Sequence, residues 1–196
     1  MANVKGQTKT QSPEVIVGLG NPGEQYKYTR HSIGFAAIDA LAEKLGANYW
    51  KSQAGCLTCA VNYSFGGQVV KLVLAKPQDY MNTSGGPVSK LLRELKLAPA
   101  ELLVIHDEVD LPDGEIKSKF GGGLNAHNGL RSIADKLQTR DFGRIRTGIG
   151  RPPGKMSVAD YALRTLKGEQ LIRFEILAQE AADMALQLVE GKPYQS

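Results

Sequence analysis

Hydrophobic residues along the chain occur either in short runs or at spacings of three and four, which predicts strands interleaved with helices. The runs predict strands over residues 14–19, 56–63, 69–75, 102–105 and 144–149. The helical spacing predicts helices over residues 33–45, around Leu91, Leu92 and Leu95, and over residues 128–137 and 169–189. This order predicts an α/β fold: a single-domain, three-layer sandwich with a twisted mixed, largely parallel sheet flanked by helices.

The same pattern predicts where the domain begins and how its last helix packs. Residues 1–13 carry no apolar periodicity, so we expect a disordered N-terminal extension followed by one α/β domain over residues 14–192. In the helix over residues 169–189, we expect Ile172, Ile176 and Leu186 to form the buried side.

Composition places the chain among ordinary globular proteins. It has 196 residues, 42% of them hydrophobic and 22% charged, and it lacks the run of about 18 apolar residues that a membrane span needs. Residues 1–13 contain no apolar core of a secretory signal, so the expected location is the cytoplasm. Cys56 and Cys59 fall on opposite faces of one predicted strand, which disfavours a metal or redox pair and suits free thiols in a reducing compartment.

Positive charge is concentrated in one part of the chain. The net charge is +4, but residues 117–155 carry nine Lys and Arg against two Asp, and the remainder is net negative. Such a segment is either a solvated face or a surface that meets phosphate groups.

The segment GLGNPG, residues 18–23, matches the dinucleotide fingerprint G-x-G-x-x-G. That site requires a helix directly behind the glycines and an acid about 20 residues on at a strand end. Here no helical pattern starts before Ile33, and the nearest acids, Asp39 and Glu43, fall inside the helix. A nucleotide-dependent oxidoreductase is therefore the less favoured hypothesis, and no cofactor is expected.

Three asparagines follow three different strand-like segments. Asn21, Asn82 and Asn128 each lie beside glycine, and the turn at Pro22 is expected to expose the Asn21 amide at the end of the first strand. Singly, each is typical of a turn or helix cap. Together they favour a shared pocket, in which amides pair with a peptide backbone and ignore its side chains.

The chain has three histidines, His31, His106 and His127. Asp107 follows a buried strand and can fix one ring nitrogen of a histidine, leaving the other as a general base; His31 is the preferred partner. No G-x-S-x-G elbow supplies a nucleophile, and no H-E-x-x-H spacing predicts a metal. A His–Asp pair that activates water is the remaining chemistry.

Five blocks in order along the chain carry a resemblance. They are GLGNPGEQYKYTRHSIGF, KPQDYMNTSG, HDEVDLPDG, the GGG and HNGLRS stretch, and RIRTGIGRPPG. Together they resemble bacterial-type peptidyl-tRNA hydrolase over residues 15 to about 190. The resemblance implies a cytoplasmic, monomeric hydrolase that cleaves the ester between a peptide and the 3′-terminal ribose of tRNA. It implies action without metal or covalent intermediate, which recycles tRNA for translation.

The resemblance also implies roles for residues. His31 becomes the catalytic base, Asp107 orients it, and Asn21 holds the water or the scissile carbonyl. The implied contacts to the peptide and the ester come from Tyr26, Met81, Asn82, His127 and Asn128. The implied contacts to the tRNA acceptor stem, its 5′-phosphate and its CCA end come from Lys117, Lys119 and Arg146.

The chain departs from the family pattern in two places. Ser32 replaces an asparagine, and Leu124, Asn125 and Ala126 replace His-Gly-Gly in a glycine-rich loop, which puts loop flexibility and substrate grip in question. An RNA-binding relative without catalysis is the alternative function. The presence of Asn21, His31, Asp107 and Asn128 together argues against it.

Overall fold

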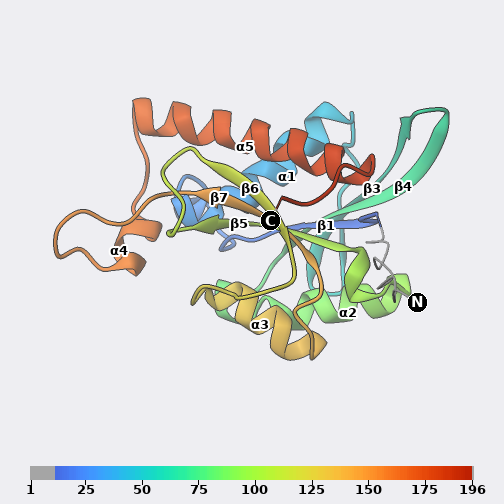
Figure 1. The fold of residues 1–196 in the computed structure, drawn as a ribbon, viewed down its shortest axis with the longest axis horizontal. Coiled ribbons are helices and arrows are strands. Elements are labelled where there is room, and N and C mark those ends of the chain that lie inside the picture. The colour runs from blue at the N-terminus through green and yellow to red at the C-terminus, as the bar shows by residue number, and fades with distance from the viewer. Residues whose placement is uncertain (1–11, 196) are drawn as a thin grey trace, which may run out of the picture.

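The computed structural model describes residues 12–195, which form one mixed sheet between two layers of helices (Figure 1). The strands are β1 (Val15–Gly18), β2 (Lys51–Gln53), β3 (Cys56–Phe65), β4 (Gln68–Pro77), β5 (Leu102–Glu108), β6 (Ile116–Phe120) and β7 (Gly143–Gly148). The helices are α1 (Ile33–Lys44), α2 (Gly85–Leu95), α3 (Asn128–Leu137), α4 (Val158–Leu163) and α5 (Glu169–Val189).

The sheet has the strand order β2-β3-β4-β1-β5-β7-β6. Its four central strands, β4, β1, β5 and β7, run parallel, while β2, β3 and β6 pair antiparallel toward the edges. The predicted mixed sheet is confirmed. Every residue of β1 and β5 is buried, as expected for parallel strands that are covered on both faces.

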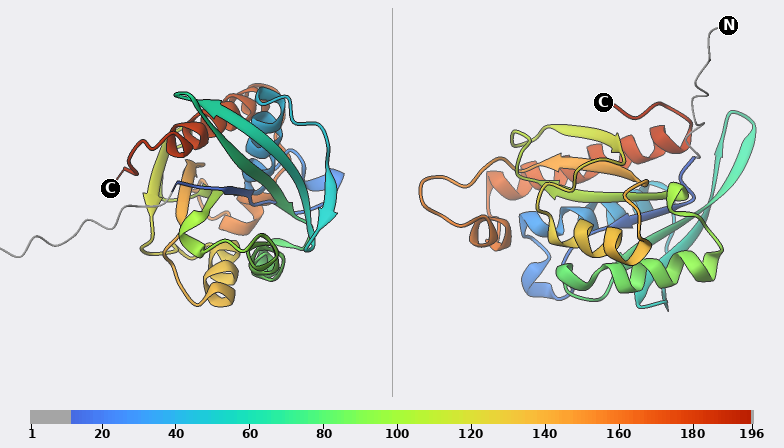
Figure 2. Two further views of the ribbon diagram at one scale, coloured as in Figure 1. Left: turned by 90° about the vertical axis from the view of Figure 1, so that its right-hand side faces the viewer. Right: turned by 60° about the horizontal axis from the view of Figure 1, so that its bottom comes forward.

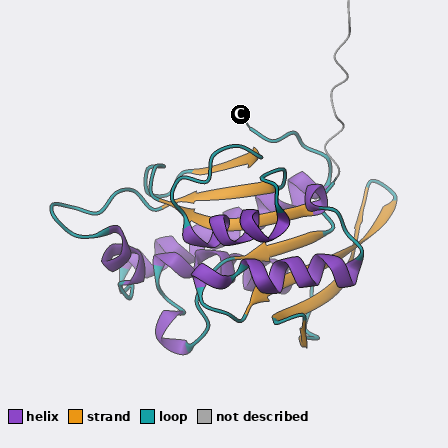
Figure 3. Ribbon diagram, turned by 90° about the horizontal axis from the view of Figure 1, so that it is seen from below, coloured by secondary structure: helices purple, strands orange, loops and turns teal. Residues whose placement is uncertain are grey.

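Helices α1 and α5 cover one face of the sheet, and α2 and α3 cover the other (Figure 2, left; Figure 3). Side chains of β5 alternate between the two layers. Leu103 and Ile105 pack with α1 and α5, whereas Leu102 and Val104 pack with α2 and α3. The three-layer prediction is therefore correct, and these two apolar clusters form most of the core, with a third, smaller cluster around Ile33 and Phe174.

Gly18, the first glycine of the GLGNPG segment, serves packing. A Cβ atom on Gly18 would lie 2.0 Å from the carbonyl oxygen of Gly34, and one on Gly34 would lie 2.2 Å from the backbone nitrogen of Leu19. Only hydrogen atoms fit at these two positions, so α1 begins in direct contact with the end of β1. The short 3₁₀-helix Arg30–Ser32, which immediately precedes α1, is thereby held beside that end.

The packing prediction for α5 is wrong at two of three positions. Leu186 is buried, but Ile172 and Ile176 are 58% and 53% exposed. The helix turns small residues toward α1 instead, among them Ala178, Ala181, Ala182 and Ala185. Ile172 and Ile176 line a groove of about 910 Å³ between α5, α1 and the turn after β1.

Three short elements were not predicted from the sequence, whereas the two cysteines lie as expected. Strands β2 and β6 carry few apolar residues, and helix α4 has six residues, too few to show a helical repeat. Cys56 and Cys59 are free, buried and on opposite sides, since Cys59 pairs with Leu74 of the α1 and α5 layer. No helix among residues 12–195 is long and apolar enough to cross a bilayer. The predicted disorder of residues 1–13 lies outside the described residues, apart from Ser12 and Pro13.

Candidate active site

The predicted site residues meet where the central parallel strands end. Asn21 follows β1, Met81 and Asn82 form a 3₁₀-helix after β4, and Asp107 lies near the end of β5. These three strands run parallel, so their carboxyl ends share one edge of the sheet. The chain leaves β1 toward α1 on one face and β4 toward α2 on the other. Such a switch point is where open α/β sheets bind ligands.

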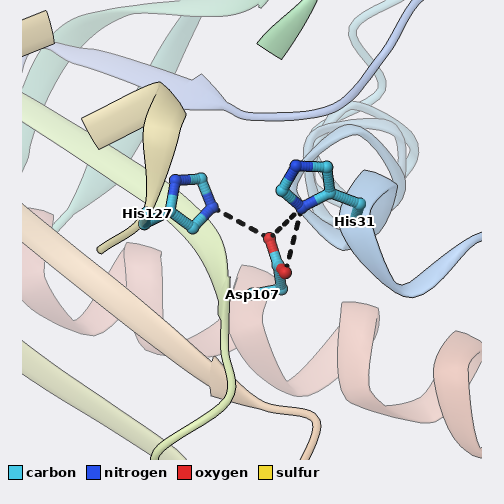
Figure 4. Close-up of side chains that lie close together, drawn as sticks. All are labelled: His31, Asp107 and His127. Carbon is cyan, nitrogen blue, oxygen red and sulfur yellow. Dashed lines mark hydrogen bonds and ion pairs between the residues drawn. The ribbon is translucent and has the colours of Figure 1, made fainter. Parts of the chain in front are cut away.

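The centre of the site is the buried carboxylate of Asp107 (Figure 4). His31 approaches it from the 3₁₀-helix before α1, with Nδ1 at 2.9 Å from Oδ1 and 3.0 Å from Oδ2. His127 approaches from the start of α3, with Nε2 at 3.0 Å from Oδ1. The expected pairing of His31 with Asp107 is present in the structure.

Hydrogen bonding assigns a different proton arrangement to each ring. An ionised carboxylate only accepts, so His31 donates through Nδ1 and its Nε2 is left as an acceptor with no partner among residues 12–195. His127 caps α3: its Nδ1 accepts from the Leu130 N–H at 3.3 Å while its Nε2 donates to Asp107. His31 therefore has a free basic nitrogen and His127 has none.

In this cluster, the charges and the burial shift the pKa values in opposite directions. Burial by itself raises the pKa of Asp107, but the charges and hydrogen bonds of His31 and His127 outweigh it and hold that pKa well below its usual range. Burial lowers the pKa of His31, and the charge and hydrogen bond of Asp107 outweigh it, so the net shift is upward. The pair is therefore a stable carboxylate beside a histidine of increased basicity.

Asn21 is less exposed than its turn predicts, at 9%. Its side-chain Oδ1 accepts from the Met81 N–H at 2.8 Å, and its backbone N–H donates to Ser32 Oγ at 3.3 Å. Ser32, one of the two departures from the family pattern, thus helps to hold this turn. The side-chain Nδ2 of Asn21 donates to none of the described residues, so the amide has one donor group left for a ligand.

The other predicted contact residues surround this cluster at different depths. Asn82 and Asn128 are exposed, while Met81 is buried. A Cβ atom on Gly129 would lie 2.5 Å from the Met81 sulfur, so α3 starts in close contact with the turn after β4. Tyr26 is half-buried and packs edge-to-face against Tyr80, with 6.4 Å between ring centroids.

His106 lies behind the site and is fully buried. Its Nδ1 donates to the Asp107 carbonyl at 2.8 Å, and its ring packs against His127 with 5.0 Å between centroids. Burial lowers the pKa of His106 well below its usual range, and the nearby His127 adds to this. A neutral imidazole that supports the strand is the interpretation that fits.

The three basic residues predicted to meet tRNA share one face of the sheet. Lys117 stands opposite Arg146 in the antiparallel β6–β7 pair, and Lys119 follows two positions later. Lys117 Nζ pairs with Glu115 at 2.6 Å, and Arg146 Nε pairs with buried Glu108 at 3.1 Å. Lys119 has no ion pair among residues 12–195. The sequence offered no sign of Glu108 beyond its place next to Asp107.

His31, Asp107 and His127 also form the group whose ligand atoms could hold a metal, all lying within 4.8 Å of one another. In the arrangement described above, a proton lies between each ring and the carboxylate. A metal ion must displace both protons, and the expectation of a metal-free site stays a prediction.

Comparison with known proteins gives one consistent result. The family model for peptidyl-tRNA hydrolase matches residues 15–195. A peptidyl-tRNA hydrolase of Pseudarthrobacter chlorophenolicus is 45% identical over 178 residues, which cover 90% of both chains. One of Mycobacterium marinum is 44% identical over 185 residues, covering 91% of this chain and 92% of the other. The crystal structure of the Acinetobacter baumannii peptidyl-tRNA hydrolase superposes with a TM-score of 0.81 at 33% identity, covering 95% of this chain and 92% of the other.

Proposed function

Because this chain belongs to the peptidyl-tRNA hydrolase family, we propose that it hydrolyses the ester between a peptide and the 3′-terminal ribose of tRNA, with His31 as the general base. One observation carries the assignment of the base. Both oxygens of Asp107 hold His31 Nδ1, which leaves Nε2 as the free basic nitrogen of the cluster.

The reaction then needs two proton transfers at His31. Nε2 takes a proton from water as the water attacks the ester carbonyl, and Asp107 stabilises the resulting imidazolium. The tetrahedral intermediate collapses as Nε2 returns the proton to the departing 3′-oxygen of the ribose. His127 keeps its proton throughout, because its Nδ1 is committed to the α3 cap, and it helps to orient Asp107.

Asn21 is assigned to the water or the developing oxyanion. Its Oδ1 is fixed by the Met81 N–H, so the direction of its free NH₂ group is set before substrate arrives. A donor held in place at a developing negative charge costs no reorganisation during reaction. The contacts to the peptide and the ester are assigned to Asn82, Asn128, Tyr26, Met81 and the ring face of His127. These contacts do not distinguish one peptide side chain from another.

Lys117, Lys119 and Arg146 are assigned to the acceptor stem and the 5′-phosphate, since phosphate contacts add affinity without sequence preference. The CCA end would then lie between this face and His31. A monomer in the cytoplasm remains our expectation.

Deacylation of N-blocked aminoacyl-tRNA tests the proposal. Wild type should release the blocked amino acid, and His31→Ala should lose about 10²–10⁴ in kcat, the usual contribution of a general base. Tyr49→Ala changes an exposed ring outside the site and serves as the control, which should leave kcat unchanged. If wild type binds tRNA and releases nothing, the chain is an RNA-binding relative without catalysis. A His31→Ala variant as fast as wild type contradicts the assignment of the base.

A further inference from the structure

Glu108 is a buried carboxylate that the reaction does not use, placed one residue after Asp107. Its side chain is 3% exposed, and successive residues of a strand face opposite sides, so it points away from His31. Its oxygens accept three hydrogen bonds, from the Asp110 N–H at 3.1 Å, from Asn125 Nδ2 at 3.0 Å and from Arg146 Nε at 3.1 Å. The last two donors share one oxygen, Oε2.

Arg146 is held by one part of its guanidinium only. Nε donates to Glu108, whereas the two terminal nitrogens donate to none of residues 12–195. The side chain is 17% exposed, and Lys117 lies beside it on the same face. A guanidinium fixed through Nε can still present both terminal nitrogens to a phosphate, which is a strong, oriented contact.

Asn125 connects the same carboxylate to the loop over residues 121–126, between β6 and α3. The backbone φ angles of Asn125 and Ala126 are both positive, at 47 and 60 degrees respectively. This left-handed conformation is one that Asn tolerates and Ala disfavours. In this conformation Asn125 donates to Glu108. The loop leads directly into His127, which donates to Asp107. Glu108 thus joins the RNA-facing arginine to the segment that enters the catalytic cluster.

We propose that Glu108 is a positioning residue that couples phosphate binding at Arg146 to the conformation of the loop over residues 121–126. A phosphate on the terminal nitrogens fixes the guanidinium, which fixes the Glu108 carboxylate and so the Asn125 bond. Coupling of this kind is reciprocal, so disturbing the loop weakens phosphate binding by the same factor. The inference rests on the proposed function for its phosphate, which is that of tRNA.

A double-mutant cycle tests the coupling. Asn125→Gly removes one bond to Oε2, and Arg146→Lys replaces the guanidinium, which donates to Oε2 through Nε and presents two further nitrogens, with a single ammonium group. The two side chains share no bond with each other. One readout is KM and kcat for N-blocked aminoacyl-tRNA. The other is the affinity for an acceptor-stem hairpin that carries a 5′-phosphate or a 5′-hydroxyl. The double variant should bind at least about threefold better than the product of the single effects, the size expected of linked residues.

Matched controls separate coupling from general damage. Ala126→Gly relieves the backbone strain of the left-handed residue next to Asn125 and removes no hydrogen bond. Its effect on hairpin affinity should therefore be independent of the effect of Arg146→Lys, so that the two fold-changes multiply. Glu108→Met keeps the volume of the side chain and removes the oxygen that accepts both bonds, so in this background the non-additivity between Asn125→Gly and Arg146→Lys should disappear. If Glu108→Met does not fold, the Asn125 and Ala126 cycles in the wild-type background still decide.

Two results overturn the inference. One is multiplicative effects of Asn125→Gly and Arg146→Lys on affinity for the 5′-phosphorylated hairpin. The other is non-additivity that persists unchanged in folded Glu108→Met protein. Hairpin affinity is measured without turnover, so a protein that fails to hydrolyse peptidyl-tRNA contradicts the proposed function and leaves the coupling test intact.

Discussion

Asp107 accepts hydrogen bonds from two histidines, and the surroundings of each ring decide what it can do. His31 has no second partner among the described residues, so its Nε2 is free to take a proton. The second ring nitrogen of His127 accepts the hydrogen bond that caps α3. The sequence predicted His31 with Asp107 but assigned His127 only to substrate, because nothing in the letters HNG shows which ring nitrogen caps the helix and which one meets Asp107.

The raised pKa of His31 predicts the pH dependence of the reaction. The base acts in its neutral form, so kcat/KM should fall as pH drops through a pKa above the ordinary value of about 6.5. Asp107→Asn removes the charge that raises this pKa and leaves the burial that lowers it. The acid limb should then move below about pH 6.5 while kcat falls, as measured by pH-rate profiles of both proteins. An acid limb that stays in place contradicts the role of Asp107.

Metal removal is a second test at the scale of residues. Because a proton occupies each His–Asp contact, prolonged treatment with a chelator should leave kcat unchanged. Excess Zn²⁺ should inhibit by displacing the two protons from the group formed by His31, Asp107 and His127. Activity that disappears on chelation and returns with one metal would contradict a metal-free site.

At the scale of elements, contact between helices explains where the sequence pattern failed. Both α1 and α5 carry alanines, and small side chains let two helices approach closely. The buried stripe of α5 therefore follows Ala178, Ala181 and Ala185. Hydrophobicity alone ranks Ile172 and Ile176 above these alanines, and so it selected the wrong face. Strand β6 was missed because two lysines and a serine separate its only apolar residues, Ile116 and Phe120.

Two neighbouring residues of α5 test this assignment. Leu177 is buried and Ile176 is exposed, at 6% and 53% respectively. Leu177→Ala should therefore reduce the free energy of unfolding by about 2–5 kcal/mol. Ile176→Ser should change that free energy by at most about 0.5 kcal/mol, as is usual for surface substitutions. Denaturant melts of the two variants provide the measurement, and equal losses of stability would contradict the burial pattern of α5.

At the scale of the whole molecule, three basic residues of the positively charged segment, residues 117–155, lie together in the fold. Lys117, Lys119 and Arg146 lie on one face of the β6–β7 pair, next to the carboxyl end of β5 where Asp107 lies. Local acids partly neutralise this face, since Glu115 and Glu108 each pair with one of the three. Lys119 is the residue of the three whose charge has no such partner among residues 12–195.

Salt dependence should reveal that difference. Lys119→Ala should raise KM for tRNA and reduce the slope of log affinity against log salt by about 1, with little change in kcat. Lys71→Ala removes the same charge from the exposed part of β4 far from its carboxyl end and should leave the slope unchanged. An equal change in both variants would show a general charge effect in place of a local contact.

That residues 14–192 form one domain and act as a monomer stays a prediction.

The amino-acid sequence by itself determined the alternation of strands and helices and the order of the motif blocks, and it selected His31, Asp107 and Asn21 as candidate site residues. These depend on local spacing and on residue chemistry, which letters carry directly. Tertiary structure decided which face of α5 is buried, how far Asn21 is exposed and that Glu108 joins Arg146 to Asn125. Residue 108 ends β5 and residue 146 lies in the neighbouring parallel strand β7, whereas residue 125 comes from the loop between β6 and α3, so the three meet only when the sheet has formed. Hydrogen bonds formed there depend on where the backbones end in space, and no local pattern encodes that.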